Sequence, residues 1–338
     1  MKVVTFGEIM LRLAPYGYLR FLQEPSFQAT FGGGEANVAV SLSNFNVDTE
    51  FVTKLPDNDI AKGCIRELNK FGVNTSNICF GGDRMGIYFL EKGASMRGSK
   101  VIYDRKYSSI SMASVEDFDW DKIFDGCDVF HFTGITPAVS DNLAIITEIA
   151  CKKAKEKGIT ISCDLNYRKK LWTKEKANKV MTKLMQYVDI CIANEEDAQD
   201  VFNISANADL NAGKLDRDRY VDVCKQLVDM FNFKKVAITL RESISANDNN
   251  WGAMLYSDGK SYYSKTYSVR IVDRVGGGDS FGAGLIYSIL NNYSNQDTIE
   301  FAAAASALKQ TIEGDFSLVS VDEVKSLMNG NVGGRVQR

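Results

Sequence analysis

Several features are scarce or absent in this sequence, and each gap excludes a class of function. The 338 residues contain a single histidine, His131, which excludes a histidine-rich metal site and any Ser-His mechanism that does not use that residue. No apolar run reaches the roughly 20 residues needed to span a bilayer. The formal net charge of -3 argues against nucleic acid as the main partner.

The cysteines show no pairing pattern. No C-x-x-C motif occurs and the number is odd, with most cysteines in apolar runs: Cys64, Cys79, Cys127, Cys151, Cys163, Cys191 and Cys224. This distribution is typical of free, buried thiols in a reducing compartment. Residues 1–6 indicate a strand and not a signal peptide, so we expect a cytoplasmic protein.

The chain does contain alternating strand and helix patterns. Apolar residues make up 45% of it, enough for a core. Apolar runs predict strands at 3–13, 50–55, 128–132, 159–163, 189–193, 235–240, 251–256 and 260–267, and periodic segments predict helices at 59–71, 142–157 and 301–310. This order predicts a doubly wound α/β domain. His131 ends one of these runs, where we expect a hydrogen-bonded core residue.

Two further strands interrupt the alternation, at residues 86–91 and 100–105. With the irregular stretch before residue 32 they predict a small inserted sheet that forms a lid. We expect a single domain over 1–330, lid strands inserted at about 11–31 and 84–112, and a flexible tail over 331–338. Exposed edges of such a sheet invite pairing, which favours a homo-oligomer, a dimer or higher.

A glycine-rich turn near the C-terminus carries the main chemical signal. Gly276, Gly277 and Gly278 precede Asp279 and an apolar, helix-compatible run. If Asp279 opens the helix, the unpaired N–H groups there form an anion site, and its carboxylate can take a proton from an attacking hydroxyl. This combination indicates phosphoryl transfer. The alternative is a plain turn in which Asp279 only caps the helix.

Two common nucleotide motifs do not fit this turn. No Walker A lysine is present, and Phe281 stands where a dinucleotide fingerprint needs Gly or Ala. Residues 273–284 instead resemble the C-terminal signature D-T-x-G-A-G-D of the ribokinase-like (PfkB) carbohydrate kinases, with departures at Arg274 and Gly277.

The resemblance implies a fold and roles for the turn. The implied fold is a doubly wound, mainly parallel α/β sheet flanked by helices, with a small β-sheet lid. Asp279 would be the catalytic base. The amides from Gly276 to Asp279 would form the anion hole for the phosphoryl group, with ATP and Mg²⁺ as cofactors.

A second glycine stretch resembles the N-terminal signature of the same family, G-G-x-x-x-N-x-A. It includes Gly33, Gly34 and Asn37. We expect a substrate cradle made of main-chain groups and the Asn37 amide. The alternative is close helix packing over the small residues that follow.

Polar residues after the later strands are expected to complete the site, because carboxyl ends of parallel strands face the ligand crevice. The stretch Asn194–Asp197 resembles the family motif N-x-x-E, with Asp197 in the Glu position, so Glu196 and Asp197 are candidates to hold Mg²⁺ through water. Helix capping is the alternative. The resemblance implies ATP contacts at Asn166, Asn194, Thr239, Arg241, Gly276, Gly278, Ala304 and Lys309, and a possible monovalent cation near the last two.

The arginines favour an acidic sugar. Tyr103 and Arg105 share one face of a lid strand, and Arg168 follows the strand at 159–163. Arg168 could bind either a substrate carboxylate or the transferred phosphate. A carboxylate gains charge-assisted hydrogen bonds from a guanidinium. The pattern resembles the 2-keto-3-deoxygluconate kinases of the family, which implies substrate contacts at Gly34, Tyr88, Tyr103, Arg105, Arg168 and Asp279.

The implied reaction is ATP-dependent phosphorylation of the terminal hydroxyl of 2-keto-3-deoxygluconate. Three alternatives stay open at this point. A fructokinase or another neutral-sugar kinase would use the same machinery, and so would a nucleoside kinase. A catalytically silent sugar-binding regulator is the non-enzyme alternative.

Overall fold

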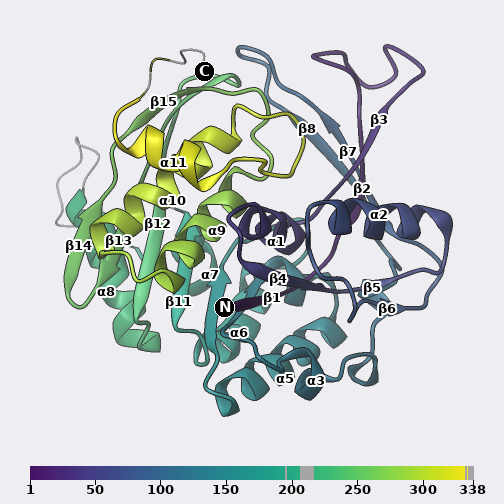
Figure 1. Cartoon of the computed structure of the whole chain (residues 1–338), viewed down its shortest axis with the longest axis horizontal. Coiled ribbons are helices and arrows are strands. Elements are labelled where there is room, and N and C mark those ends of the chain that lie inside the picture. The colour runs from purple at the N-terminus through teal and green to yellow at the C-terminus, as the bar shows by residue number, and fades with distance from the viewer. Residues whose placement is uncertain (195, 206–216, 332, 334–338) are drawn as a thin grey trace.

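A large mixed sheet forms the body of the molecule, as seen in a computed structural model that describes residues 1–194, 196–205, 217–331 and 333 (Figure 1). Within these residues the sheet has nine strands. Its spatial order is β14 (Lys260–Tyr263), β13 (Asp248–Ser257), β12 (Lys235–Ser243), β11 (Ile190–Asn194), β10 (Thr160–Asp164), β9 (Val129–Thr133), β1 (Lys2–Phe6) and β4 (Asp48–Val52), with β15 (Tyr267–Arg270) also paired to β13. The run from β12 to β4 is parallel, and β13 is antiparallel to β12.

Helices cover both faces of this sheet, because its strands bury side chains on each side. Val3 packs in one layer and its neighbour Val4 in the other. The first layer contains α1 (Gly34–Asn44), α9 (Gly277–Leu290), α10 (Asn295–Lys309) and α11 (Val321–Met328). The second contains α3 (Trp120–Ile123), α4 (Ile135–Val139), α5 (Asp141–Glu156), α6 (Lys174–Met185), α7 (Asp197–Phe202) and α8 (Arg217–Phe231).

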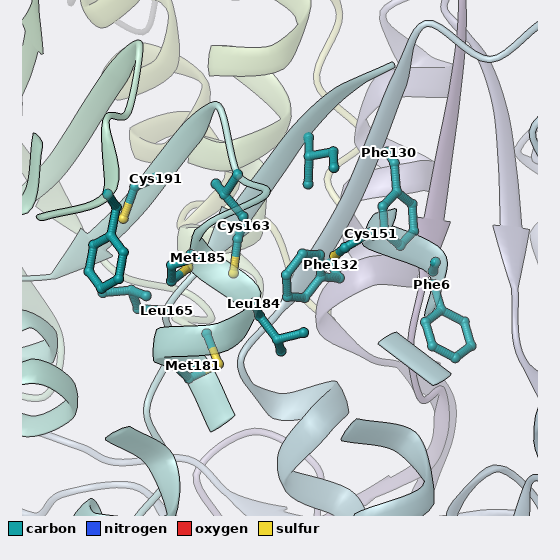
Figure 2. Close-up of a cluster of buried hydrophobic side chains, with 14 of the residues drawn as sticks. Phe6, Phe130, Phe132, Cys151, Cys163, Leu165, Met181, Leu184, Met185 and Cys191 are labelled. Atoms are coloured by element: carbon teal, nitrogen blue, oxygen red, sulfur yellow. The ribbon is translucent and has the colours of Figure 1, made fainter. Parts of the chain in front are cut away.

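Figure 2 shows the second layer, where Phe130 and Phe132 of β9 lie among cysteine, leucine and methionine side chains. Near the first layer, α2 (Asp59–Lys70) packs on α1, and the short strands β5 (Lys54–Leu55) and β6 (Cys79–Phe80) pair with each other. Two short 3₁₀ turns, Ile110–Met112 and Val115–Asp117, precede α3.

A separate small sheet stands beside one end of the large one, at the upper right of Figure 1. Its order is β3 (Gln28–Gly32), β2 (Met10–Ala14), β7 (Gly86–Glu91) and β8 (Lys100–Asp104). The predicted ribokinase-like α/β class with an additional small sheet is therefore confirmed. Of the expected tail, residues 332 and 334–338 lie outside the described residues.

Several local predictions differ from the structure. The strand expected over 50–55 divides into β4 and β5, which lie in separate sheets. The strand expected over 3–13 is split at residues 7–9, because the chain leaves the large sheet there and enters the small one. The strand expected to end at residue 240 continues to Ser243, where its extension pairs with β13. The segment 260–267 divides into two strands. Helix α9 begins at Gly277 after an N-cap at Gly276, so Asp279 lies inside its first turn and does not open it.

The prediction for His131 is confirmed, and five of the seven cysteines are buried as expected, whereas Cys79 and Cys127 are half-buried. His131 is buried in β9, and its Nδ1 lies 3.1 Å from the Ser162 hydroxyl. Burial lowers its pKa to about 3, so the ring is neutral. All seven cysteines are free thiols. In the described part of the chain, no helix combines the length and apolar character needed to cross a bilayer.

Candidate active site

A cavity of about 540 Å³ opens at the carboxyl ends of the parallel strands, within the range of small-molecule sites. The small sheet forms one wall and the turn before α9 forms its floor. The structure brings most of the predicted site residues to this cavity: Gly33, Gly34, Asn37, Tyr88, Tyr103, Arg105, Asn166, Arg168, Asn194, Glu196, Asp197, Thr239, Arg241, Gly276, Gly277, Gly278 and Asp279.

The backbone conformation at position 276 requires glycine. Its φ is +81°, and a Cβ there would lie 2.1 Å from the carbonyl oxygen of Asp315, so both conformation and space require glycine. The turn directs the start of α9 at the cavity. Within the described residues, the N–H groups of Gly278 and Asp279 have no main-chain acceptor, because the first intrahelical bond is donated by Ser280. The turn therefore presents free donors to an anion.

Asp279 lies beside these donors. Its Oδ2 accepts a hydrogen bond of 2.6 Å from Nδ2 of Asn37, on α1. Although the side chain keeps a partly exposed edge, burial raises the pKa of Asp279 to about 6; Glu35 and Asp315 act in the same direction, and Asn37 and Arg168 oppose it. A carboxyl with this pKa is ionised at neutral pH yet close enough to it to accept a proton during a reaction.

Gly34, at the start of α1, faces Asp279. A Cβ on Gly34 would lie 3.5 Å from Oδ1 of Asp279 and 3.4 Å from Thr133. The main chain of α1 and the Asp279 carboxyl therefore face each other across a gap without an intervening side chain.

Glu35 is a second buried carboxyl below this gap, and sequence reasoning assigned it no role. Its Oε1 accepts from the N–H of Thr133 and from the hydroxyls of Thr133 and Thr136, at 3.0, 2.7 and 2.6 Å. Burial raises its pKa. A Cβ on Gly7 would lie 2.2 Å from the Glu35 carboxyl, so the glycine after β1 leaves space for it.

A buried ion cluster joins the small sheet to the turn before α9. Arg12, on β2, donates to Asp273 at 2.5 Å and to Asp315 at 2.6 Å. The hydroxyl of Tyr88, on β7, donates to the same Asp315 at 2.6 Å. Asp273 in turn accepts from the N–H groups of Val275 and Gly314. Tyr88 thus lines the cavity with its hydroxyl already engaged.

Arg105 is also engaged. Its Nε donates to Oε2 of Glu8 at 2.7 Å, its Nη2 donates to the same oxygen, and Ser108 donates to the other oxygen at 2.8 Å. Glu8 is 3% exposed, so this pair closes the joint between the two sheets. Tyr103 is more open, and the Arg105 guanidinium lies 5.5 Å from its ring centre.

Three other arginines at the cavity have no carboxylate partner within the described part of the chain: Arg168, Arg241 and Arg274. Among the described residues, Arg168 donates to one main-chain oxygen, that of Tyr167 at 3.3 Å. Arg274 donates to the main-chain oxygens of Ala246 at 3.0 Å and Ser245 at 3.5 Å. Burial and the nearby Arg241 lower the pKa of Arg274. These unneutralised charges suit the cavity to anionic ligands.

The proposed magnesium residues differ in their availability. Both oxygens of Asp197 are taken by main-chain N–H groups, those of Tyr167 at 3.1 Å and Asn194 at 3.0 Å. Burial raises the pKa of Asp197, although these bonds oppose it. Glu196 is exposed at the rim. Among the described residues, no group of three metal-ligating side chains occurs.

Two predicted ATP residues are not brought to the cavity. Ala304 is fully buried in the layer between α9 and α10, so its role in this structure is helix packing. Lys309 is also fully buried, and its Nζ donates to main-chain oxygens behind the turn.

Sequence reasoning missed several lining residues, namely Glu8, Glu35, Asp164, Asn249, Trp251, Arg274, Gln310 and Asp315. Asp164 carries a sequence signal, because it directly follows the strand predicted at 159–163. Its pKa is raised well above the ordinary value, first by burial and then by Asp197 and Asp279. Asn249 is 3% exposed, and its Oδ1 has no partner within the described residues. The others reach the cavity only through the tertiary fold.

Comparison with known proteins gives a consistent result. The family model described as "pfkB family carbohydrate kinase" matches residues 1–317. The 2-dehydro-3-deoxygluconokinase of Thermotoga maritima, of known crystal structure, is 53% identical, with a TM-score of 0.94 and 98% of each chain covered. A 2-dehydro-3-deoxygalactonokinase of Haloferax volcanii is 31% identical over 98% of each chain. The 2-dehydro-3-deoxygluconokinase of Bacillus subtilis is 27% identical over 93% of this chain and 91% of its own.

Proposed function

The chain belongs to the PfkB family of carbohydrate kinases, and we propose that it transfers the γ-phosphoryl group of ATP to the terminal hydroxyl of 2-keto-3-deoxygluconate, the substrate also called 2-dehydro-3-deoxygluconate. The product is 2-keto-3-deoxy-6-phosphogluconate. The observation that carries this proposal is the placement of Asp279 beside free helix N–H groups in a cavity with unpaired guanidinium groups.

The sugar acid is proposed to bind between the small sheet and α1. Gly33, Gly34 and Asn37 supply the cradle, and Tyr103 supplies a hydroxyl and a flat apolar face. Arg168 is the better candidate for the carboxylate, because Arg105 is neutralised by its ion pair with Glu8. A free guanidinium gains more from a substrate carboxylate than one that must first give up a buried partner.

ATP is proposed to lie at the other end of the cavity, where Asn194, Thr239 and Arg241 line the wall. Arg241 and Arg274 face its phosphates. Glu196 and Asn166 are positioned to bind waters of a magnesium ion, which would neutralise charge on the phosphates. Asp197 contributes indirectly, because it holds the loops after β10 and β11 together.

The residues of the chain then perform an in-line displacement. Asp279 accepts the proton of the terminal hydroxyl while the hydroxyl oxygen bonds to the γ-phosphorus. The bond from that phosphorus to the bridging oxygen breaks, and ADP leaves with the electron pair. The N–H groups of Gly278 and Asp279 stabilise charge on the transferred group.

A substrate panel with ATP tests the proposal, with ³¹P NMR of the product as the readout. We expect 2-keto-3-deoxygluconate to give the highest kcat/KM. A higher kcat/KM for fructose would favour the neutral-sugar kinase, and a higher kcat/KM for a nucleoside would favour the nucleoside kinase. Absence of any phosphorylated product would favour the catalytically silent regulator.

The Haloferax relative provides a specific reason for a second candidate, 2-keto-3-deoxygalactonate, which differs in the configuration at one carbon. This epimer has the same carboxylate and terminal hydroxyl as 2-keto-3-deoxygluconate, so the same residues would bind it. The panel therefore includes both epimers, and the ratio of their kcat/KM values assigns the preference.

Assembly and location are further parts of the proposal. Ile102 is 51% exposed and Tyr103 40% exposed on the edge strand β8, which supports pairing of small sheets in a homodimer or higher oligomer. Sedimentation analysis would check this. The free cysteines support a cytoplasmic location, which cell fractionation would check. We also propose that the small sheet acts as a lid over the end of the cavity that binds the sugar acid.

A further inference from the structure

A buried ammonium group lies directly behind the glycine turn. Lys309 is the last residue of α10 and has no exposed surface. Its Nζ donates to three main-chain oxygens, those of Asp273 at 3.3 Å, Ile312 at 3.3 Å and Gly314 at 2.6 Å. The three oxygens come from two loops, one before α9 and one after α10, so the ammonium joins them.

The partners of this ammonium are unusual for a buried lysine. A fully buried charge is normally compensated by an opposite charge in contact, yet within the described residues no carboxylate lies in ion-pair contact with Lys309. Its three donors are matched by three neutral carbonyls. Carbonyl oxygens arranged in this way are also how proteins bind a bare monovalent metal ion.

The position of Lys309 links it to the proposed anion hole. A Cβ on Gly276 would lie 3.1 Å from Cε of Lys309, so the lysine stem supports the turn from behind. Asp273, which supplies one of the carbonyls, holds the N–H of Val275 with its carboxylate. Displacement of the ammonium would therefore release both loops that shape the turn.

Opposing influences act on the charge of Lys309, and their net effect is to lower its pKa. Burial lowers its pKa, whereas the carboxylates of Asp273, Asp315 and Asp279 favour its protonated form and Arg12 opposes it.

We propose that Lys309 is a positioning residue whose ammonium serves as a built-in monovalent cation, holding the turn at Gly276 and giving it a permanent positive charge. The inference rests on the proposed kinase function. It implies that the enzyme needs no monovalent metal ion from solution, and it replaces the ATP contact expected of Lys309 with a role behind the site.

The first test uses the unmodified protein. Phosphorylation of 2-keto-3-deoxygluconate is measured with Mg²⁺ and ATP as Tris salts, and again with K⁺, Na⁺ or tetramethylammonium chloride at equal ionic strength. Equal turnover in all salts is expected. Activation of several-fold by K⁺ or Na⁺ over tetramethylammonium would overturn the inference. Absence of product in every salt would instead reject the proposed function.

The second test removes the ammonium. Lys309→Ala should lower kcat by about 10- to 100-fold, less than the effect of losing a direct oxyanion donor, with KM for the sugar acid nearly unchanged. Ammonium or methylammonium ions should restore part of the lost kcat, because they can enter the vacated carbonyl cage. A purely structural role predicts no such rescue, and unchanged kcat would contradict the proposal.

Lys235→Ala is the matched control. Lys235 is half-buried and, like Lys309, donates to neutral oxygens, those of Ser257 and Asn295 at 3.2 and 2.5 Å. It is the first residue of β12 and so lies at the end of that strand away from the cavity. Its kcat should equal that of the unmodified protein, with or without ammonium. If Lys309→Ala does not fold, the salt comparison on the unmodified protein still decides the matter.

Discussion

Asp279 is held in surroundings that oppose its negative charge, and this has consequences at the scale of the residue. Burial and the neighbouring Glu35 and Asp315 raise its pKa to about 6, and Asn37 limits the rise. The same features that would suit it to the proposed role of a base near neutral pH make it costly to keep ionised in the folded protein.

We predict that kcat/KM falls as the pH drops below about 6, because a protonated Asp279 cannot accept the substrate proton. In Asn37→Ala the acid limb should move to higher pH, since the hydrogen bond that favours the carboxylate is lost. The pH profiles of both proteins check this. Asn44→Ala, on the same helix but bonded to Ser317, is the control, and its limb should not move. An unshifted limb in Asn37→Ala would contradict the stated cause.

We also predict that Asp279→Asn stabilises the fold at pH 8. The pKa of Asp279 in the folded state, about 6, lies above its unfolded value near 4. The carboxyl therefore destabilises the folded protein increasingly as the pH rises from 4 to 6, and it has no such effect below pH 4. Removal of the charge should raise the free energy of unfolding by about 1–3 kcal/mol at pH 8 and by nearly nothing at pH 4. Urea denaturation at both values measures this. Equal effects at the two pH values would be inconsistent with the raised pKa.

At the scale of the element, the N-terminus of α9 depends on a single backbone conformation. Gly276→Ala would place a Cβ where φ is +81° and where the Asp315 carbonyl lies 2.1 Å away. We predict that this substitution lowers the free energy of unfolding by about 1–3 kcal/mol and severely lowers kcat. Gly278→Ala is the stability control, because a Cβ there has no neighbour within 4 Å. Similar stability of the two variants, by thermal denaturation, would contradict the argument.

Local chemistry explains which elements could be predicted from the sequence. The glycine turn, Asp279 and the Asn37 stretch carry their own patterns, and the alternating strands carry theirs. Arg12 could not be assigned, because it meets Asp315 across 303 positions, and only the fold brings β2 to the turn. Lys309 was assigned to ATP from its region alone, whereas the direction of its side chain depends on how the loop after α10 closes.

At the scale of the whole molecule, the cavity combines walls from two sheets. The Glu8–Arg105 pair and the Arg12 cluster join the small sheet to the large one, so a ligand between them should stabilise both together. We predict that 2-keto-3-deoxygluconate raises the Tm of the unmodified protein and of Asp279→Asn, by mass action. Fructose at equal concentration should have a smaller effect. Arg168→Met should reduce the rise in Tm caused by the sugar acid. An equal rise in Arg168→Met and in the unmodified protein would contradict the proposal that Arg168 binds the substrate carboxylate.

The most direct test of the central claim is phosphoryl transfer itself, measured by ³¹P NMR with 2-keto-3-deoxygluconate and ATP in the unmodified protein and in Asp279→Asn. The account predicts 2-keto-3-deoxy-6-phosphogluconate from the unmodified protein and a kcat lowered by about 10²–10⁴-fold in the variant, with the affinity for ATP preserved. A variant that turns over at nearly the normal rate would contradict the assignment of Asp279 as the base.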